Sequence, residues 1–245
     1  MLKRIVDAIV SAIGLIISSP VLLFFAVAVW LQDFRSPFYI ADRVGNGGRS
    51  FKMVKLRSMV VNADGNGVTS TSDSDSRITL IGKLIRKLKL DEITQLWNVL
   101  IGDMSLVGPR PNVARWGVDL YTAEEMHLLS VRPGITDFSS IVFADEGTIL
   151  SSEKDPDLAY NQLIRPWKSR LSLFYIDRQS IWLDIKLVFI TALSIISRGK
   201  ALKLVERELR RLEAPSELID VASRKSDLIP CAPPGSTVVI SSLPH

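Results

Sequence analysis

Two neighbouring carboxylates, Asp91 and Glu92, and an arginine flanked by prolines, Arg110, have the types and spacing for chemistry. A carboxylate pair can hold Mg²⁺, which prefers oxygen ligands and often bridges to substrate phosphates. An aspartate can also attack phosphorus covalently, and a guanidinium binds phosphate oxygens through its planar fork of donors. Together these residues indicate phosphoryl transfer on a diphosphate. The alternative, which spacing alone favours, is a pair of solvated carboxylates that complement the dipole of a helix start.

The segment before the carboxylates predicts a basic amphipathic helix over residues 80–88. Apolar residues occur at 81, 84, 85 and 88, a period of 3.6. Such a stripe suits a protein core and a membrane interface equally. Nearby cations stabilise an ionised carboxylate, so we expect Asp91 to be deprotonated at neutral pH. The cations lie at Lys83, Arg86, Lys87 and Lys89.

On a helix, consecutive residues point about 100° apart. Asp91 and Glu92 are therefore expected to divide two tasks, those of nucleophile and metal ligand. Gln95 follows Asp91 by one turn and is expected to orient a carboxylate or a substrate oxygen. The prolines beside Arg110 restrict the backbone and should hold its guanidinium in a fixed direction, which is preorganised charge stabilisation.

The composition limits the function classes. The chain has 245 residues, of which 47% are hydrophobic, and a net charge of +4. This mild basic excess suits an anionic membrane surface or a phosphate-rich substrate, and it is too small to indicate nucleic-acid binding. The single cysteine, Cys231, excludes an intramolecular disulfide. With only two histidines, a zinc site is not expected, so a catalytic metal should be bound by oxygen.

Residues 8–31 are almost entirely apolar, and a helix of this length can cross a hydrocarbon core of roughly 30 Å. Pro20 lies inside the segment and predicts a kink, where Ser18 and Ser19 can satisfy the freed carbonyls. Positive charges flank both ends, so the positive-inside rule does not place them on opposite sides. A kinked spanning helix and a re-entrant helix broken at Ser19–Pro20 fit these residues about equally well.

The remaining segments predict a small α+β domain. Residues 38–43 and 50–57 are expected to form a β-hairpin around the glycine-rich turn at 45–48. Residues 62–76 are expected to form a surface loop, for which a flexible lid is one role. A helix is expected from residue 185 to about 197. A short amphipathic helix at 202–212 is expected to dock on the core or to form a homodimer. Residues 214–245, rich in Ser and Pro, are expected to be loosely ordered.

The run from Leu90 to Pro111 resembles the signature of the bacterial monotopic phosphoglycosyl transferases, which initiate glycan assembly on a polyprenol phosphate. The run 55–59 (Lys-Leu-Arg-Ser-Met), the element 131–136 (Val-Arg-Pro-Gly-Ile-Thr) and the closing segments 174–177 and 180–186 also resemble family elements. So does the amino-terminal segment, with Lys3, Arg4, Asp7 and the Ser-Pro break. The likeness extends to about residue 198.

The resemblance implies a re-entrant amino-terminal helix and a fold of a compact catalytic domain with interfacial amphipathic helices. It implies a monotopic enzyme on the cytoplasmic face of the bacterial inner membrane. This enzyme would transfer a sugar phosphate from a nucleotide-sugar donor, expected to be UDP-linked, to undecaprenyl phosphate, and it would release UMP. Asp91 would be the nucleophile and Glu92 the Mg²⁺ ligand. The residues implied to contact the substrate or its phosphates are Lys55, Arg86, Gln95, Arg110, Arg132 and Asp184, of which Asp184 could instead hold a basic residue or cap a helix.

The chain departs from the family pattern after residue 136. Many members continue with Gly-Trp-Ala-Gln-Val-Asn-Gly-Arg, whereas this chain reads Asp-Phe-Ser-Ser-Ile-Val-Phe-Ala-Asp-Glu over 137–146. Any nucleotide contact from the missing arginine must come from another residue. A divergent active subgroup is the favoured interpretation, because the carboxylate pair and Arg110 are present. The alternatives are a catalytically silent membrane-anchored scaffold of a glycan-assembly complex and a phosphohydrolase that uses water as the acceptor.

The predicted organisation has three parts: a re-entrant membrane helix over 1–33, a catalytic domain over 34–198, and an amphipathic helix with a loosely ordered tail over 199–245. Membrane lipids are expected partners of the first part. A soluble donor and a lipid-embedded acceptor must meet at headgroup depth, and a shallow anchor would bring Asp91 to that level.

Overall fold

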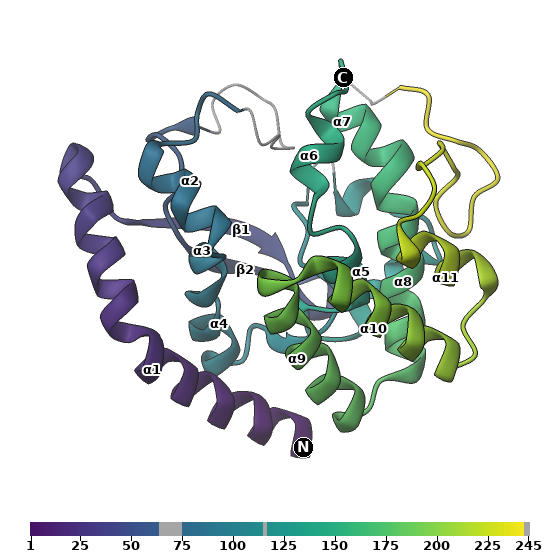
Figure 1. Ribbon diagram of the computed structural model, residues 1–245, viewed down its shortest axis with the longest axis horizontal. Helices are drawn as coiled ribbons and strands as arrows, with labels where there is room; N and C mark the ends of the chain where they lie inside the picture. Colours follow the sequence, from purple (N-terminus) through teal and green to yellow (C-terminus); the bar gives the residue numbers. More distant parts are fainter. Residues whose placement is uncertain (64–74, 115–116, 243–245) are drawn as a thin grey trace.

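The computed structural model describes residues 1–63, 75–114 and 117–242, and it has the expected mixture of helices and short strands (Figure 1). Most of the loop predicted at 62–76 lies outside the described residues. The strands form two two-stranded sheets. Helices surround both sheets, and α1 curves along one edge of the molecule.

Helix α1 is a single continuous helix, Leu2–Asp33, that contains Pro20. Ser19 acts as predicted, since its Oγ donates at 2.8 Å to Ile16 O, the carbonyl that Pro20 leaves without an amide donor. Ser18 Oγ donates instead to Gly14 O at 2.7 Å. The helix is long and apolar enough to cross a membrane. The predicted interruption at Ser19–Pro20 does not appear, since the helix is continuous through Pro20.

Both halves of α1 contact the rest of the chain. In the first half, Lys3 pairs with Asp184, and Asp7 accepts hydrogen bonds from Ser105 Oγ (2.8 Å) and Leu106 N (3.3 Å). In the second half, Phe25, Ala26 and Val29 form a small core with residues of the next elements, namely Leu56, Ile85 and Leu90. The helix is therefore one wall of the domain along most of its length.

The predicted hairpin is confirmed. Strand β1 (Phe38–Val44) pairs antiparallel with β2 (Ser50–Leu56) across a turn in which Gly47 and Gly48 have positive φ. Asn98 ties β2 to the next layer, since its side chain accepts from Val54 N at 2.9 Å and donates to Lys52 O at 2.7 Å. Thr94 Oγ1 donates to Val54 O at 3.1 Å. These bonds hold the carboxylate segment against β2.

Three short helices follow: α2 (Leu80–Lys87), α3 (Leu90–Ile93) and α4 (Leu96–Ile101). Thr79 caps α2 by accepting from Gly82 N at 2.9 Å. Lys89 ends the α2 turn in the left-handed conformation, φ 56°, so the chain changes direction immediately before Asp91. The apolar stripe of α2 is divided, with Ile85 buried against α1 and Leu84 exposed.

The second sheet is a parallel pair, β3 (Ser105–Val107) and β4 (Gly134–Thr136). A Cβ on Gly134, the first residue of β4, would lie 2.1 Å from Gly108 N, so the close approach of Gly108 to β4 requires glycine at this position. The main core packs around this pair and includes Val99, Met104, Phe138, Leu171 and Leu187. Other elements of this half are η3 (Val118–Leu120), η4 (Glu125–Ser130), α5 (Phe138–Val142), α6 (Glu146–Leu150), α7 (Pro156–Ala159), η5 (Tyr160–Ile164), α8 (Arg165–Arg178) and α9 (Ile181–Ile196).

The carboxyl-terminal part packs on this core. Helix α10 (Arg198–Arg211) buries Val205 and Leu209, which is the docking alternative predicted for this amphipathic segment. A further helix, α11 (Ser216–Ser223), lies in the stretch expected to be loosely ordered and packs on α10 and α8. Residues 229–242, here called the C-terminal strap, run over η5, where Cys231 N donates to Gln162 O at 3.1 Å and Gln162 Nε2 donates to Ile240 O at 2.6 Å.

Candidate active site

A large cleft of about 1280 Å³ lies between the hairpin and α2–α3 on one side and α5–α8 on the other. Five of the predicted site residues line it together: Lys55, Arg86, Asp91, Glu92 and Arg110. Lys55 comes from β2, which Asn98 and Thr94 hold against the carboxylate segment. The contact of β2 with α3 and α4 therefore brings Lys55 into the same cleft as Asp91 and Glu92.

Glu92 and Arg110 form an ion pair, with Arg110 Nη2 donating to Glu92 Oε1 at 2.8 Å. Burial alone would raise the pKa of Glu92. The charge of Arg110, followed by those of Lys89 and Lys55, reverses this effect and lowers the pKa to about 2. Glu92 is therefore ionised throughout the neutral range. In turn Glu92 raises the pKa of Arg110 above its usual value.

The pKa of Asp91 is shifted in the opposite direction from that of Glu92. Burial and the charge of Glu92 raise its pKa, and the opposing cations Lys55, Lys89 and Arg86 do not compensate. The basic cluster lowers the pKa of Asp91 as predicted, but the sequence reasoning left out burial and the like charge of Glu92, which outweigh the cations and make the net shift upward. Among the described residues, no group donates a hydrogen bond to the buried Oδ1 of Asp91. An unpaired buried carboxylate oxygen is costly and is typical of a functional group that awaits a ligand.

Lys55 and Arg86 place positive charge beside the carboxylates. Burial, together with the charge of Arg110, lowers the pKa of Lys55 to about 8, so the ammonium form still predominates near neutral pH. Arg86 Nε donates to Ser58 Oγ at 2.9 Å, which positions the guanidinium at the edge of the cleft. These cations can bind the oxygens of a phosphate group next to Asp91.

The residues present suit an oxygen-bound Mg²⁺. No group of three or more His, Cys, Asp or Glu side chains within the described ranges forms a complete metal cage. Mg²⁺ commonly uses only one or two carboxylates and completes its coordination with water and substrate phosphates. Ionised Glu92 and the unpaired Oδ1 of its neighbour Asp91 supply that kind of donor set.

Three predicted residues do not line the cleft. Arg132 is exposed on the loop before β4. Gln95 is buried at the start of α4, and its Nε2 has no hydrogen-bond partner among the described residues. Asp184 pairs with Lys3 and accepts from Tyr175 Oη at 2.6 Å, so it holds a basic residue in place, while Ser180 caps α9. The helix-break residues Ser19 and Pro20 lie in α1, away from the cleft.

The structure adds residues to the cleft that the sequence reasoning missed. Glu146 of α6 forms an ion pair with Lys168 of α8, and Lys168 Nζ lies 5.5 Å from the centre of the Tyr160 ring. All three line the cleft. Glu146 belongs to the segment 137–146 that departs from the family pattern, which is the one signal in the sequence that pointed to it. No feature of the sequence pointed to Lys168 or Tyr160 as residues of the cleft.

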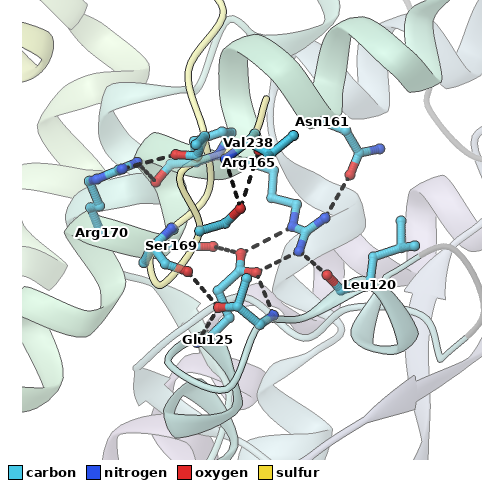
Figure 2. A network of polar contacts seen from close by, with 12 residues as sticks. Leu120, Glu125, Asn161, Arg165, Ser169, Arg170 and Val238 are labelled. Atoms are coloured by element: carbon cyan, nitrogen blue, oxygen red, sulfur yellow. Dashed lines mark hydrogen bonds and ion pairs between the residues drawn. The ribbon is translucent and has the colours of Figure 1, made fainter. Parts of the chain in front are cut away.

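A buried network supports the same side of the cleft (Figure 2). Glu125 has no exposed surface and accepts hydrogen bonds from Arg165 and from Ser169 Oγ (2.7 Å). Arg165 also donates to Asn161 Oδ1 at 3.1 Å and to Leu120 O. Asn161, Arg165 and Ser169 line the cleft as well. Because Glu125 and Arg165 are buried and hydrogen-bonded to each other and to their neighbours, they hold this wall of the cleft in shape.

The fold and the cleft define a protein with an apolar helix at its edge and a phosphate-suited acidic and basic site inside. Residues 1–198 match the family model for bacterial sugar transferases, and the chain belongs to this family. The resemblance found in the sequence is thereby confirmed.

Several curated relatives have stated activities. The chain is 36% identical over 203 residues to the UDP-N-acetylgalactosamine-undecaprenyl-phosphate N-acetylgalactosaminephosphotransferase of Aeromonas hydrophila, a match that covers 80% of this chain and 44% of the relative. It is 35% identical over 191 residues (77% and 39%) to the UDP-glucose:undecaprenyl-phosphate glucose-1-phosphate transferase of Klebsiella pneumoniae. To the protein of the same description from Caulobacter vibrioides it is 32% identical over 204 residues (81% and 71%). The chain thus spans less than half the length of the first two relatives.

Proposed function

We propose that this protein transfers a sugar 1-phosphate from a UDP-sugar to undecaprenyl phosphate through a covalent intermediate on Asp91. The observation that carries the proposal is the cleft itself, in which an aspartate with an unpaired oxygen lies beside an ionised Glu92–Arg110 pair and two further cations. The family membership and the stated activities of the relatives support the same reaction class.

In the first step, a carboxylate oxygen of Asp91 attacks the phosphorus that carries the sugar. The bond from this phosphorus to the bridging oxygen breaks, and UMP leaves with the bonding electron pair. Lys55 and Arg110 bind the phosphate oxygens and reduce the charge repulsion between the carboxylate and the diphosphate. Glu92 would hold Mg²⁺, which would supply further charge neutralisation at the diphosphate.

In the second step, a phosphate oxygen of the polyprenol phosphate attacks the same phosphorus. The bond to Asp91 breaks, the carboxylate is regenerated, and the product is a polyprenol diphosphate sugar. Arg86 and Lys83, at the α2 edge of the cleft, are suited to the incoming phosphate.

The contacts of α1 support a proposal for the membrane arrangement. Both halves of this apolar helix contact the same domain, which would draw both of its ends toward one face of the bilayer. We propose that α1 enters and leaves the cytoplasmic leaflet by bending at Ser19–Pro20 in the membrane, and that the protein is monotopic. This arrangement brings the cleft to headgroup level, where a soluble donor can meet a lipid acceptor.

The covalent step has a direct test. Purified protein is incubated with Mg²⁺ and a UDP-sugar alone, and its intact mass is measured. We expect a mass increase equal to one sugar phosphate in the wild type and no increase in Asp91→Asn. A wild type that releases UMP only when polyprenol phosphate is present, and that never carries the adduct, would contradict covalent catalysis.

A further inference from the structure

The Glu146–Lys168 pair lies on the wall of the cleft that α6 and α8 form, on the other side from α2 (Figure 1). Its side chains are 31% and 14% exposed, so the pair is accessible from the cleft while its surroundings are largely dry. Lys168 donates to Oε2 of Glu146. The 31% exposure of the Glu146 side chain leaves part of it open to a ligand in the cleft.

The two walls differ in charge. The α2 side carries Lys83, Arg86, Lys87 and Lys89, which attract phosphate. On the α6 side, the opposite charges of Glu146 and Lys168 cancel, and the carboxylate of Glu146 would repel a phosphate group. A neutral pair that offers both acceptor oxygens and ammonium donors suits an uncharged ligand with many hydroxyl groups.

The proposed chemistry brings such a ligand to this place. Asp91 and Arg110 engage the phosphorus to which the sugar is attached, so the sugar ring must lie in the cleft next to Arg110. The ionised form of Glu146, disfavoured by burial, is stabilised by Lys168 and then by Arg110, and the pKa of Glu146 is lowered. Glu146, Lys168 and Arg110 line the same cleft.

We infer that Glu146 and Lys168 form the sugar-binding subsite of the cleft and determine which sugar of the donor is accepted. The Tyr160 ring, over which Lys168 lies, forms the side of this subsite. The inference rests on the proposed function, since it assigns a part of the same cleft to the sugar. It also gives a role to the segment that replaces the missing Asn-Gly-Arg pattern.

The test compares donors with the sugar-free product. Wild-type protein is first screened for UMP release from UDP-glucose, UDP-galactose and their two N-acetylated amino-sugar counterparts. Glu146→Gln and Lys168→Met are then assayed with the best donor, and UMP is titrated as a competitive inhibitor. Glu206→Gln serves as the matched control, because its ion pair with Arg210 on α10 lies outside the cleft.

We expect both cleft variants to lower kcat/KM for the best donor by about 10-fold to 100-fold, because a site built to hydrogen-bond a hydroxyl discriminates strongly when a partner is lost. The ratio between donors should also change. The inhibition constant of UMP should stay within about 2-fold of the wild type, because UMP has no sugar, and Glu206→Gln should change neither value.

Two results would overturn the assignment. One is unchanged donor kinetics in both variants, and the other is an equal weakening of UMP and donor, which would place the pair at the nucleotide or in the support of the wall. If the wild type released no UMP from any donor, the proposed function itself would fail. Donor affinity, measured by calorimetry, would then test the assignment of the sugar-binding subsite. Equal affinity in wild type and Glu146→Gln would refute this assignment.

Discussion

Replacement of Asp91 by asparagine should abolish turnover and stabilise the fold at the same time. Burial and Glu92 raise the pKa of Asp91, so its ionised form is less favourable in the folded protein than in the unfolded chain. The neutral amide has nearly the same shape and removes this repulsion. Relief at a strained functional site commonly yields about 1 kcal/mol, which corresponds to a rise in Tm of about 2–4 °C for a chain of this size. Loss of the nucleophile should lower kcat by about 10³-fold or more.

The pH dependence of the stability difference between Asp91→Asn and the wild type is a second test of whether the substitution stabilises the fold. A carboxyl group with a raised pKa contributes stability below its unfolded pKa, about 3.9, and loses that contribution as the pH rises through its folded pKa. The stability advantage of Asp91→Asn should therefore be largest at neutral pH and disappear toward pH 4. The assay is thermal unfolding in one detergent at several pH values, with the exposed Asp220→Asn on α11 as the control. A variant that is less stable than the wild type at pH 7, or that keeps its turnover, would refute the reasoning.

Three further predictions concern the supports of the cleft. Arg110→Gln removes the strongest compensating charge of Glu92, and it should lower kcat by about 10²–10³-fold and the free energy of unfolding by about 1–3 kcal/mol. Urea unfolding should show this loss at neutral pH, where the lowered pKa of Glu92, about 2, gives its full stabilisation, and equal stability would contradict it. In a double-mutant cycle, Lys3→Met and Asp184→Asn should be coupled by about 1 kcal/mol, and additive effects would show that their ion pair does not hold α1. Thr122→Val removes the hydrogen bond to the strap at Pro234, so limited proteolysis within 229–242 should become faster, and an unchanged cleavage rate would exclude that contact as an anchor.

Much of the end of the cleft that carries the carboxylates could be predicted because its signals are local. The hairpin has turn residues between two strand-like runs, and α2 has a clear 3.6 period with Thr79 at its start. The likeness to the family then connected Lys55 and Arg110 to the carboxylate segment, and the structure brings these residues into one cleft. Local patterns and a long family signature were sufficient for this part of the molecule.

Other features depend on contacts that no local pattern contains. The partner of Asp184 is Lys3, 181 residues away, so only the fold could distinguish this role from substrate binding. The pKa of Asp91 depends on burial, which outweighs a count of neighbouring cations. Similarly, Glu146 and Lys168 are 22 residues apart and meet only because α6 and α8 pack on the same wall.

The contacts of α1 explain how the anchor and the chemistry are connected. Arg4 donates to the carbonyl groups of Val99 and Leu100, in the last turn of α4, where a cation also complements the helix dipole. Helix α4 follows α3, which carries Asp91, and Asn98 and Thr94 join this segment to β2. A change in the depth of α1 must therefore move Asp91 and Lys55 together. A helix that spanned the bilayer would have to break the contacts of one half or draw the polar cleft into the hydrocarbon, where charged groups are costly. The shallow α1 that we propose would keep the contacts of both halves and would hold the cleft at the level of the two proposed substrates.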